Sequence, residues 1–88
     1  MKLSELYQRA SVGTLSMTED VEVTGLCRDS RLVSAGDMFL CREGTHFDSH
    51  TVAMELACAV VVAHRPLEGN TPCWVVAPGE EALIAANV

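Results

Sequence analysis

The stretch GLCRDSRLVSAGDMFLCREGTHFDSH, residues 25–50, organises the rest of the chain. Its short apolar run at residues 38–41 predicts a buried strand, and polar turns lie on both sides of that run. The first turn is at residues 34–37, and the second pivots on Gly44, because glycine accepts backbone conformations that other residues avoid. Most of the polar residues that could bind a ligand also fall in this stretch. We therefore expect residues 25–50 to form a recognition surface for a small ligand.

The residues before this stretch predict one helix and one strand. Residues 2–10 repeat apolar side chains at helical spacing and predict a short helix, with Ser4 as a candidate N-cap and Gly13 ending it. The polar residues 14–20 predict a surface loop. Alternation of apolar and polar residues at 21–24 predicts a strand with one buried face, which leads into the central stretch.

After the central stretch, helical and strand-like segments alternate. Residues 51–58 predict a helix, the β-branched run at 60–63 predicts a central strand, and residues 73–76 predict another buried strand. Proline and glycine mark residues 64–72 as a loop, and Pro78 fits the first turn of a closing helix. Buried strands covered by helices indicate an α/β fold with a small mixed or partly parallel sheet flanked by helices. Ligands bind such sheets at loops beyond the strand ends, where the polar turns are expected.

The composition restricts the class of protein and of ligand. The 88 residues suffice for one domain, and 49% apolar residues can form a modest core. A net charge of −6 argues against general binding to DNA, RNA or an anionic membrane surface, since those surfaces attract Lys and Arg. One diphosphate is compatible with that charge, because backbone N–H groups and one or two side chains suffice to bind it. No apolar run is long enough to span a bilayer, so we expect a cytoplasmic protein.

The cysteines and histidines predict no metal site. The four cysteines are Cys27, Cys41, Cys58 and Cys73. None forms a C-x-x-C pair and each lies in or beside an apolar run, so we expect four buried thiols in a reducing compartment. His46, Asp48 and His50 alternate as zinc ligands could, but three ligands within one short turn rarely converge, and a solvated loop is the favoured interpretation.

Two segments could bind an anion, and each has a structural alternative. In Asp29-Ser30-Arg31, the Ser30 hydroxyl could bind a phosphate oxygen while Asp29 orients Arg31. The alternative is a structural turn in which Asp29 caps local N–H groups and Arg31 is solvated. At residues 44–47 a glycine turn could present backbone N–H groups to an anion, or could be an ordinary connection with Phe47 in the core. Residue types alone favour the structural alternative at both places.

Other chemistry is not indicated. The chain contains no G-x-x-x-x-G-K-[ST] or G-x-G-x-x-G motif, so it has no complete cradle for a nucleoside triphosphate or a dinucleotide. No serine, cysteine or histidine shows a nucleophile-elbow pattern or a base partner, so we predict no catalytic residue. Trp74 stands between apolar residues and is expected in the core rather than against a ligand.

The joint pattern of the polar segments resembles the N-terminal domain of the Mur ligases. Those proteins carry a DSR-x-V-x-P-G-D-x-F signature followed by G-x-x-x-D-G-H, and the corresponding residues here are DSRLVSAGDMF (29–39) and GTHFDSH (44–50). The start MKLSEL and Cys41 are most similar to the muramyl-tripeptide synthetases (MurE type), and the D-alanyl-D-alanine-adding ligases (MurF type) are the alternative. Ala35 replaces the usual proline of the first motif, and Ser49 replaces the glycine of D-G-H.

This resemblance implies a function. The chain would have the fold of the MurE and MurF N-terminal domains and would bind the UDP part of UDP-N-acetylmuramoyl-dipeptide. The family's contacts fall on Arg28, Ser30, Thr45, His46 and Phe47. The 88 residues themselves would hold no catalytic residue, metal or cofactor. A central domain that binds ATP with magnesium and a C-terminal domain would complete a three-domain, ATP-dependent amino-acid ligase of peptidoglycan precursor synthesis.

A free-standing, acidic protein-interaction module without ligase activity is the alternative. The chain stops inside or at the end of the expected closing helix, and we expect a fragment of a longer enzyme that is inactive alone. The coding sequence beyond Val88 distinguishes the two. A G-x-x-G-K-[ST] segment there supports the ligase, and a stop codon supports the module.

Overall fold

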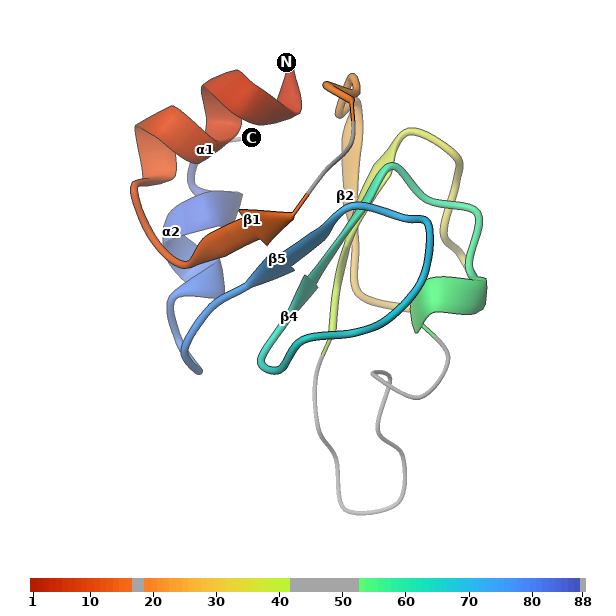
Figure 1. Ribbon diagram of the computed structural model, residues 1–88. Helices are drawn as coiled ribbons and strands as arrows, with labels where there is room; N and C mark the ends of the chain where they lie inside the picture. Colours follow the sequence, from red (N-terminus) through yellow and green to blue (C-terminus); the bar gives the residue numbers. More distant parts are fainter. Residues whose placement is uncertain (17–18, 42–52, 88) are drawn as a thin grey trace.

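The computed structural model describes residues 1–16, 19–41 and 53–87, which form a mixed α/β fold. The strands are β1 (Thr14–Ser16), β2 (Gly25–Cys27), β3 (Asp37–Leu40), β4 (Val60–Ala63) and β5 (Cys73–Val75). The helical elements are α1 (Leu3–Ala10), the 3-10 helix η2 (Ala53–Glu55) and α2 (Glu81–Ala85). The strands form a five-stranded sheet in the order β1-β5-β4-β3-β2 (Figure 1). β2 to β5 are parallel and β1 is antiparallel to β5, which confirms the predicted mixed sheet with flanking helices.

The central strands follow the predicted segments. β4 lies between β3 and β5, and all of its residues are buried. Val61 lies beside Phe39 of β3 and beside Cys73 of β5. Both faces of these parallel strands are covered, so their sequence is a continuous apolar run rather than an alternating one. The predictions for β3, β4 and β5 are therefore confirmed to within one residue at the strand ends.

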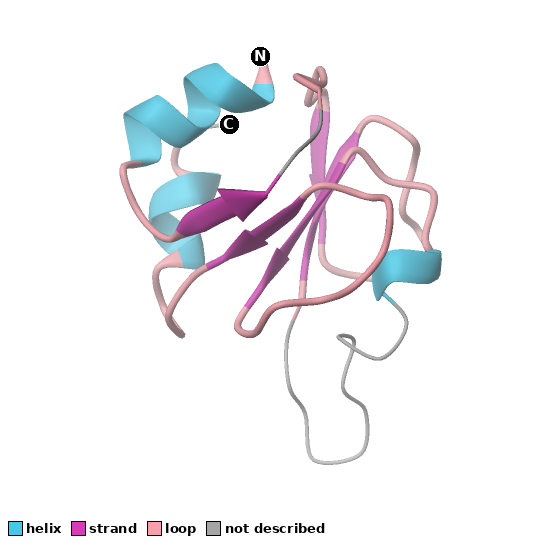
Figure 2. Cartoon of the chain, viewed as in Figure 1, coloured by secondary structure: helices cyan, strands magenta, loops and turns pink. Residues whose placement is uncertain are grey.

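Both α-helices cover the same face of the sheet (Figures 1 and 2). Leu3 and Leu6 of α1 and Ile84 of α2 are fully buried in this layer. Trp74 is also fully buried there, and its indole N–H donates to the Val12 carbonyl oxygen at 2.8 Å. Trp74 is therefore a core residue, as the sequence indicates, and not a platform for a ligand.

The opposite face is covered by irregular segments rather than by the helix predicted at residues 51–58. Only η2 forms in the described part of that range. The Leu56 N–H donates to the Ala53 carbonyl oxygen at 3.2 Å and closes a single turn. The Ala59 N–H already pairs with the Asp37 carbonyl oxygen at 2.9 Å, so the chain leaves the helical path to join the sheet. Pairing with a distant strand overrides the local helical pattern here.

Two predictions for the residues between α1 and β2 are wrong. Residues 14–16, predicted as loop, form β1 by antiparallel pairing with β5. Residues 21–24, predicted as a strand, make only an isolated bridge between Glu22 and Lys2, and β2 begins at Gly25. Strands this short carry too little pattern to be detected, and their distant partners decide which residues pair.

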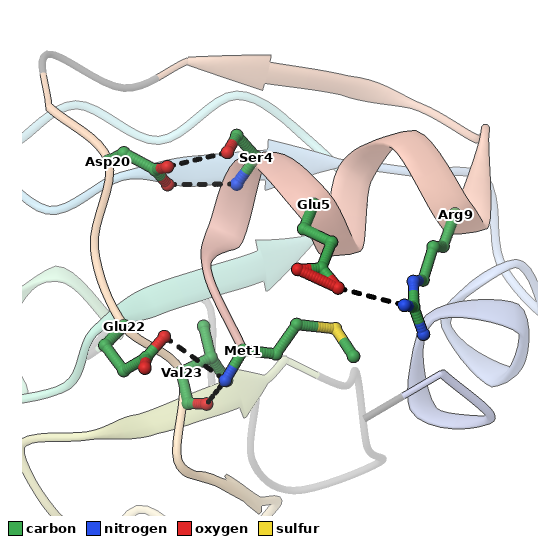
Figure 3. A network of polar contacts seen from close by, with 7 residues as sticks. All are labelled: Met1, Ser4, Glu5, Arg9, Asp20, Glu22 and Val23. Atoms are coloured by element: carbon green, nitrogen blue, oxygen red, sulfur yellow. Dashed lines mark hydrogen bonds and ion pairs between the residues drawn. The ribbon is translucent and has the colours of Figure 1, made fainter.

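The start of α1 is fastened to the segment that precedes β2 (Figure 3). The Met1 amino group donates to the Val23 carbonyl oxygen at 3.1 Å and pairs with Glu22 at 3.2 Å. The Asp20 carboxylate accepts hydrogen bonds from the Ser4 hydroxyl at 2.6 Å and from the Ser4 N–H at 3.0 Å. These bonds from Ser4 are the main cause that lowers the pKa of Asp20. Asp20, and not Ser4 as predicted, therefore supplies the acceptor at this helix start.

The helix ends also differ slightly from expectation. α1 ends at Ala10, as predicted, but its C-cap is Ser11, which is left-handed with φ 53° and donates its N–H to the Tyr7 carbonyl oxygen, whereas the sequence predicts Gly13 as the terminating residue. α2 begins at Glu81, so Pro78 lies in the turn before the helix rather than in its first turn. Within residues 1–16, 19–41 and 53–87, no helix has the length and apolar character that crossing a membrane requires.

Candidate ligand site at the carboxyl ends of the strands

The carboxyl ends of β2, β3, β4 and β5 lie at one edge of the sheet, because these strands are parallel. We call this the carboxyl edge and define it by the residues that follow Cys27, Leu40, Ala63 and Val75. The arrows of β4 and β5 in Figure 1 point toward it. Ligands of open α/β sheets bind beyond such strand ends, so the carboxyl edge is the candidate site.

A hydrogen-bonded turn follows β2 at this edge. Arg31 Nε donates to Asp29 Oδ1 at 3.1 Å, and Arg31 Nη2 donates to Asp29 Oδ2 at 3.0 Å. The Arg31 N–H also donates to Asp29 Oδ1 at 3.0 Å, and the Leu32 N–H donates to the Asp29 carbonyl oxygen at 3.0 Å. The hydrogen bond to Asp29, followed by its negative charge, raises the pKa of Arg31. Asp29 thus caps local N–H groups, as the structural alternative predicts, and also orients Arg31.

Arg28 and Ser30 belong to the same turn. Ser30 is partly exposed between Asp29 and Arg31, and Arg28 is exposed. Among the described residues the Arg28 guanidinium has no hydrogen-bond or ion-pair partner, whereas Asp29 balances the charge of Arg31. The structure therefore brings two of the predicted contacts, Arg28 and Ser30, to the carboxyl edge. Together they offer one hydroxyl and one guanidinium to an anion.

The remaining predicted contacts, Thr45, His46 and Phe47, lie outside the described residues, as do Asp48, Ser49 and His50. Their roles stay predictions. In the described part of the chain, His, Cys, Asp and Glu side chains do not gather in a group of three or more that could hold a metal ion.

The Gly36-Asp37 part of the same signature lies at the other end of the strands. Asp37 begins β3, and its carboxylate accepts a hydrogen bond from the Ser34 N–H at 2.8 Å. The Thr24 N–H donates to the Gly36 carbonyl oxygen at 2.8 Å, and a Cβ atom on Gly36 would overlap the Thr24 hydroxyl. Gly36 and Asp37 therefore hold β2 against β3 and do not belong to the carboxyl edge.

The prediction of four buried thiols is correct for two cysteines and wrong for the other two. All four are free, and Cys41 and Cys73 are buried, but Cys27 and Cys58 are partly exposed. The Cys27 thiol donates to the Asp29 carbonyl oxygen at 3.1 Å and so tightens the turn after β2, a role that the sequence did not indicate. Burial is the main cause that raises the pKa of Cys58 to about 11, which makes this thiol a poor nucleophile at neutral pH.

A contact between His64 and Glu81 also lies at the carboxyl edge and was missed by sequence reasoning. His64 follows β4, and its Nε2 is 3.2 Å from Glu81 Oε2 at the start of α2. The Gly79 N–H donates to the same oxygen at 2.9 Å. Burial alone would raise the pKa of Glu81, but hydrogen bonds from its own N–H, His64 and Gly79 outweigh it and lower that pKa. The two residues are 17 positions apart, a separation at which no local pattern signals contact.

A hollow of about 540 Å³ lies away from this edge, where β1 ends and β5 begins. It is lined by Leu15, Ser16, Leu67, Gly69, Asn70, Thr71, Pro72 and Cys73. None of these lining residues carries a charge, so the hollow lacks the cations that suit a diphosphate.

Relatives of this chain are found among known sequences, although no protein-family model matches it. The chain is 33% identical over 86 residues to UDP-N-acetylmuramoyl-L-alanyl-D-glutamate--2,6-diaminopimelate ligase of Listeria monocytogenes serotype 4b (strain F2365). That match covers 94% of this chain and 18% of the relative. It is 35% identical over 57 residues to UDP-N-acetylmuramoyl-tripeptide--D-alanyl-D-alanine ligase of Synechocystis sp. (strain ATCC 27184 / PCC 6803 / Kazusa), a match that covers 61% of this chain and 13% of the relative.

The fold has a counterpart among solved structures. A crystal structure of MurF from Acinetobacter baumannii matches with a TM-score of 0.72 and 26% identity, over 96% of this chain and 20% of that chain. The chain therefore spans about a fifth of the length of these relatives. Sequence and fold lead to the same group of enzymes, as the signature at residues 29–39 and 44–50 predicts. The chain belongs to the Mur ligase family and corresponds to its N-terminal domain.

Proposed function

We propose that this chain binds the UDP part of a UDP-N-acetylmuramoyl-peptide and is the substrate-recognition domain of a ligase in peptidoglycan synthesis. The observation that carries the proposal is the hydrogen-bonded turn after β2. In this turn the Arg31 guanidinium donates two hydrogen bonds to the Asp29 carboxylate, and these two residues flank Ser30. This turn lies at the edge of the sheet where ligands of α/β proteins bind. The Listeria relative, whose name contains a UDP-N-acetylmuramoyl substrate, supports the same ligand class.

Each contact has a distinct role in this proposal. The Ser30 hydroxyl donates a hydrogen bond to a phosphate oxygen, and the exposed Arg28 supplies positive charge. The Asp29–Arg31 pair holds the turn before the ligand arrives, which reduces the conformational entropy that binding must remove. Thr45, His46 and Phe47, which follow β3 in the sequence, complete the proposed set of contacts with the uridine or its phosphates.

The chemical reaction belongs to the rest of a longer, cytoplasmic parent protein in this proposal. A central domain would bind ATP with magnesium, and transfer of the terminal phosphoryl group of ATP to the substrate carboxylate would give an acyl phosphate and release ADP. The amine of the incoming amino acid then attacks that acyl phosphate and releases phosphate, with a C-terminal domain placing the amine. In this proposal the 88 residues form a single domain that holds the UDP end and supplies no catalytic residue.

Titration of UDP into the chain tests the proposal by calorimetry and by ¹H–¹⁵N NMR. We expect heat of binding and amide shifts at Arg28 and Ser30. The amide of Ser34, in the turn at the other end of β3, is the internal reference and should not move. Absence of heat together with unmoved signals at Ser30 and Thr45 would contradict UDP binding and favour the free-standing interaction module.

A further inference from the structure

Positively charged side chains of the described residues gather at the carboxyl edge. Arg28 and Arg31 follow β2, and Arg65 follows β4. The other described cations lie at α1, where Arg9 Nη2 pairs with Glu5 Oε1 at 3.0 Å. In a chain with a net charge of −6, this distribution makes the part of the carboxyl edge that follows β2 and β4 the described surface best suited to an anion.

Arg28 and Arg65 lie on opposite sides of β3. The sheet order puts β3 between β2 and β4, and neighbouring strands are about 4.8 Å apart, so strands β2 and β4 are separated by on the order of 10 Å. Cys27 pairs with Phe39, which pairs with Val61, so Arg28 lies one residue beyond this level of the sheet and Arg65 lies four residues beyond it. Both arginines are exposed. Two long, exposed arginine side chains on either side of β3 suit a ligand with two linked phosphates.

The described acidic groups of the same edge are Asp29 after β2, Glu68 after β4, and Glu80 and Glu81 after β5. Asp29 forms its ion pair with Arg31, so the two add little net charge. Glu80 and Glu81 follow β5, farther from β2, and bind N–H groups of the turn before α2. Counted by formal charge, residues 28–36 and 64–72 together carry +1, because three arginines outnumber Asp29 and Glu68.

We propose that Arg65 is a second cationic contact for a nucleoside diphosphate and binds the phosphate farther from the nucleoside, across β3 from Arg28. This inference rests on the proposed function. Arg65 also has an interaction within the chain, and the proposal does not require it to be unpaired. A guanidinium carries five N–H donors in one plane, so Arg65 can bind phosphate oxygens and keep that interaction.

Calorimetric titration of UDP and of UMP distinguishes this role from a general effect of charge. Arg65→Ala should weaken UDP binding by about threefold to tenfold and UMP binding by less than about twofold, because a charge-assisted hydrogen bond at an exposed site is lost with UDP alone. Arg65→Lys should recover part of the loss. Arg9→Ala also removes one exposed arginine, but from α1, and should leave both affinities unchanged.

Each outcome has a separate meaning. UDP binding that Arg65→Ala leaves intact, or an equal loss for UDP and UMP, overturns the role of Arg65 while UDP binding itself stands. Absence of UDP binding by the unsubstituted chain overturns the proposed function and this inference together. Thermal unfolding checks the fold of each variant, and Arg65→Ala should match the unsubstituted chain because the side chain is exposed.

Discussion

Arg31 and Asp29 are joined by two parallel hydrogen bonds, from Nε to Oδ1 at 3.1 Å and from Nη2 to Oδ2 at 3.0 Å, directly after β2. Their side chains are 85% and 37% exposed, so the pair contributes little to the stability of the fold. Its importance lies in restricting the backbone on both sides of Ser30. The pair therefore holds Ser30 in place for the proposed binding of UDP.

Asp29→Asn should weaken UDP binding while leaving the thermal unfolding midpoint almost unchanged. Asparagine removes the negative charge and one of the acceptors that hold Arg31, so the turn loses its order before the ligand binds. Calorimetry with UDP and a thermal melt measure the two effects. If Asp29→Asn binds UDP as tightly as the unsubstituted chain, UDP binding does not depend on the ion pair between Asp29 and Arg31.

Ser30→Ala should lower the affinity for UDP by about tenfold or more, because one hydrogen bond to a charged phosphate oxygen is lost. Ser34→Ala is the matched control, since Ser34 is an exposed serine in the turn before β3, away from the carboxyl edge. The ratio of the two dissociation constants is the readout. Equal affinities for the two variants would remove Ser30 from the site.

Gly13→Ala should destabilise the fold more than Gly79→Ala. Both glycines have positive φ, +70° for Gly13 and +97° for Gly79, so alanine adds about 1–2 kcal/mol of backbone strain at either position. At Gly13 the new Cβ would also overlap the Val75 carbonyl oxygen and the Val76 side chain, whereas Gly79 faces open space. Urea unfolding of both variants measures the difference, and equal losses would mean that β1 can move away from β5 without penalty.

The stabilising effect of Glu81 should disappear at acid pH. Its folded-state pKa lies below the ordinary value of 4.5, so the unfolded chain binds the proton more readily. Glu81 therefore stabilises the fold fully above pH 4.5, and this contribution is lost as the pH falls through the lowered folded-state pKa. Glu81→Gln should be less stable than the unsubstituted chain at neutral pH, and the difference should shrink below pH 4.5.

Urea unfolding at a series of pH values measures this change, with Glu68→Gln as a charge-matched control in the exposed loop before β5. The control should not reproduce the shrinking difference. A difference between Glu81→Gln and the unsubstituted chain that stays constant below pH 4.5 would show that the contacts with His64 and Gly79 do not depend on the charge of Glu81.

Strong local patterns made part of the fold predictable. The apolar spacing of α1 and the continuous apolar runs of β3, β4 and β5 each extend over enough neighbouring residues to specify an element. Shorter or competing patterns misled the prediction. The helix expected at residues 51–58 gives way to η2 because Ala59 bonds to Asp37, which is remote in the sequence.

The candidate site was predictable only in part. Residue types at Asp29, Ser30 and Arg31 left a structural turn and an anion site as alternatives, and the joint signature was needed to favour the second. In the structure, the described part of this signature and the neighbouring Arg28 lie at two different ends of the strands. Gly36 and Asp37 support the pairing of β2 with β3, while Arg28 and Ser30 lie at the carboxyl edge.

The sequence by itself determined the α/β class, the central strands and the membership in the Mur ligases, because each is encoded in neighbouring residues or in one continuous motif. Only the tertiary structure decided that β1 pairs with β5, that Asp20 caps α1 at Ser4 and that His64 meets Glu81. These contacts join residues 16 or more positions apart. A hydrogen bond across such a distance depends on where the whole chain brings its segments together and leaves no periodic pattern in the sequence.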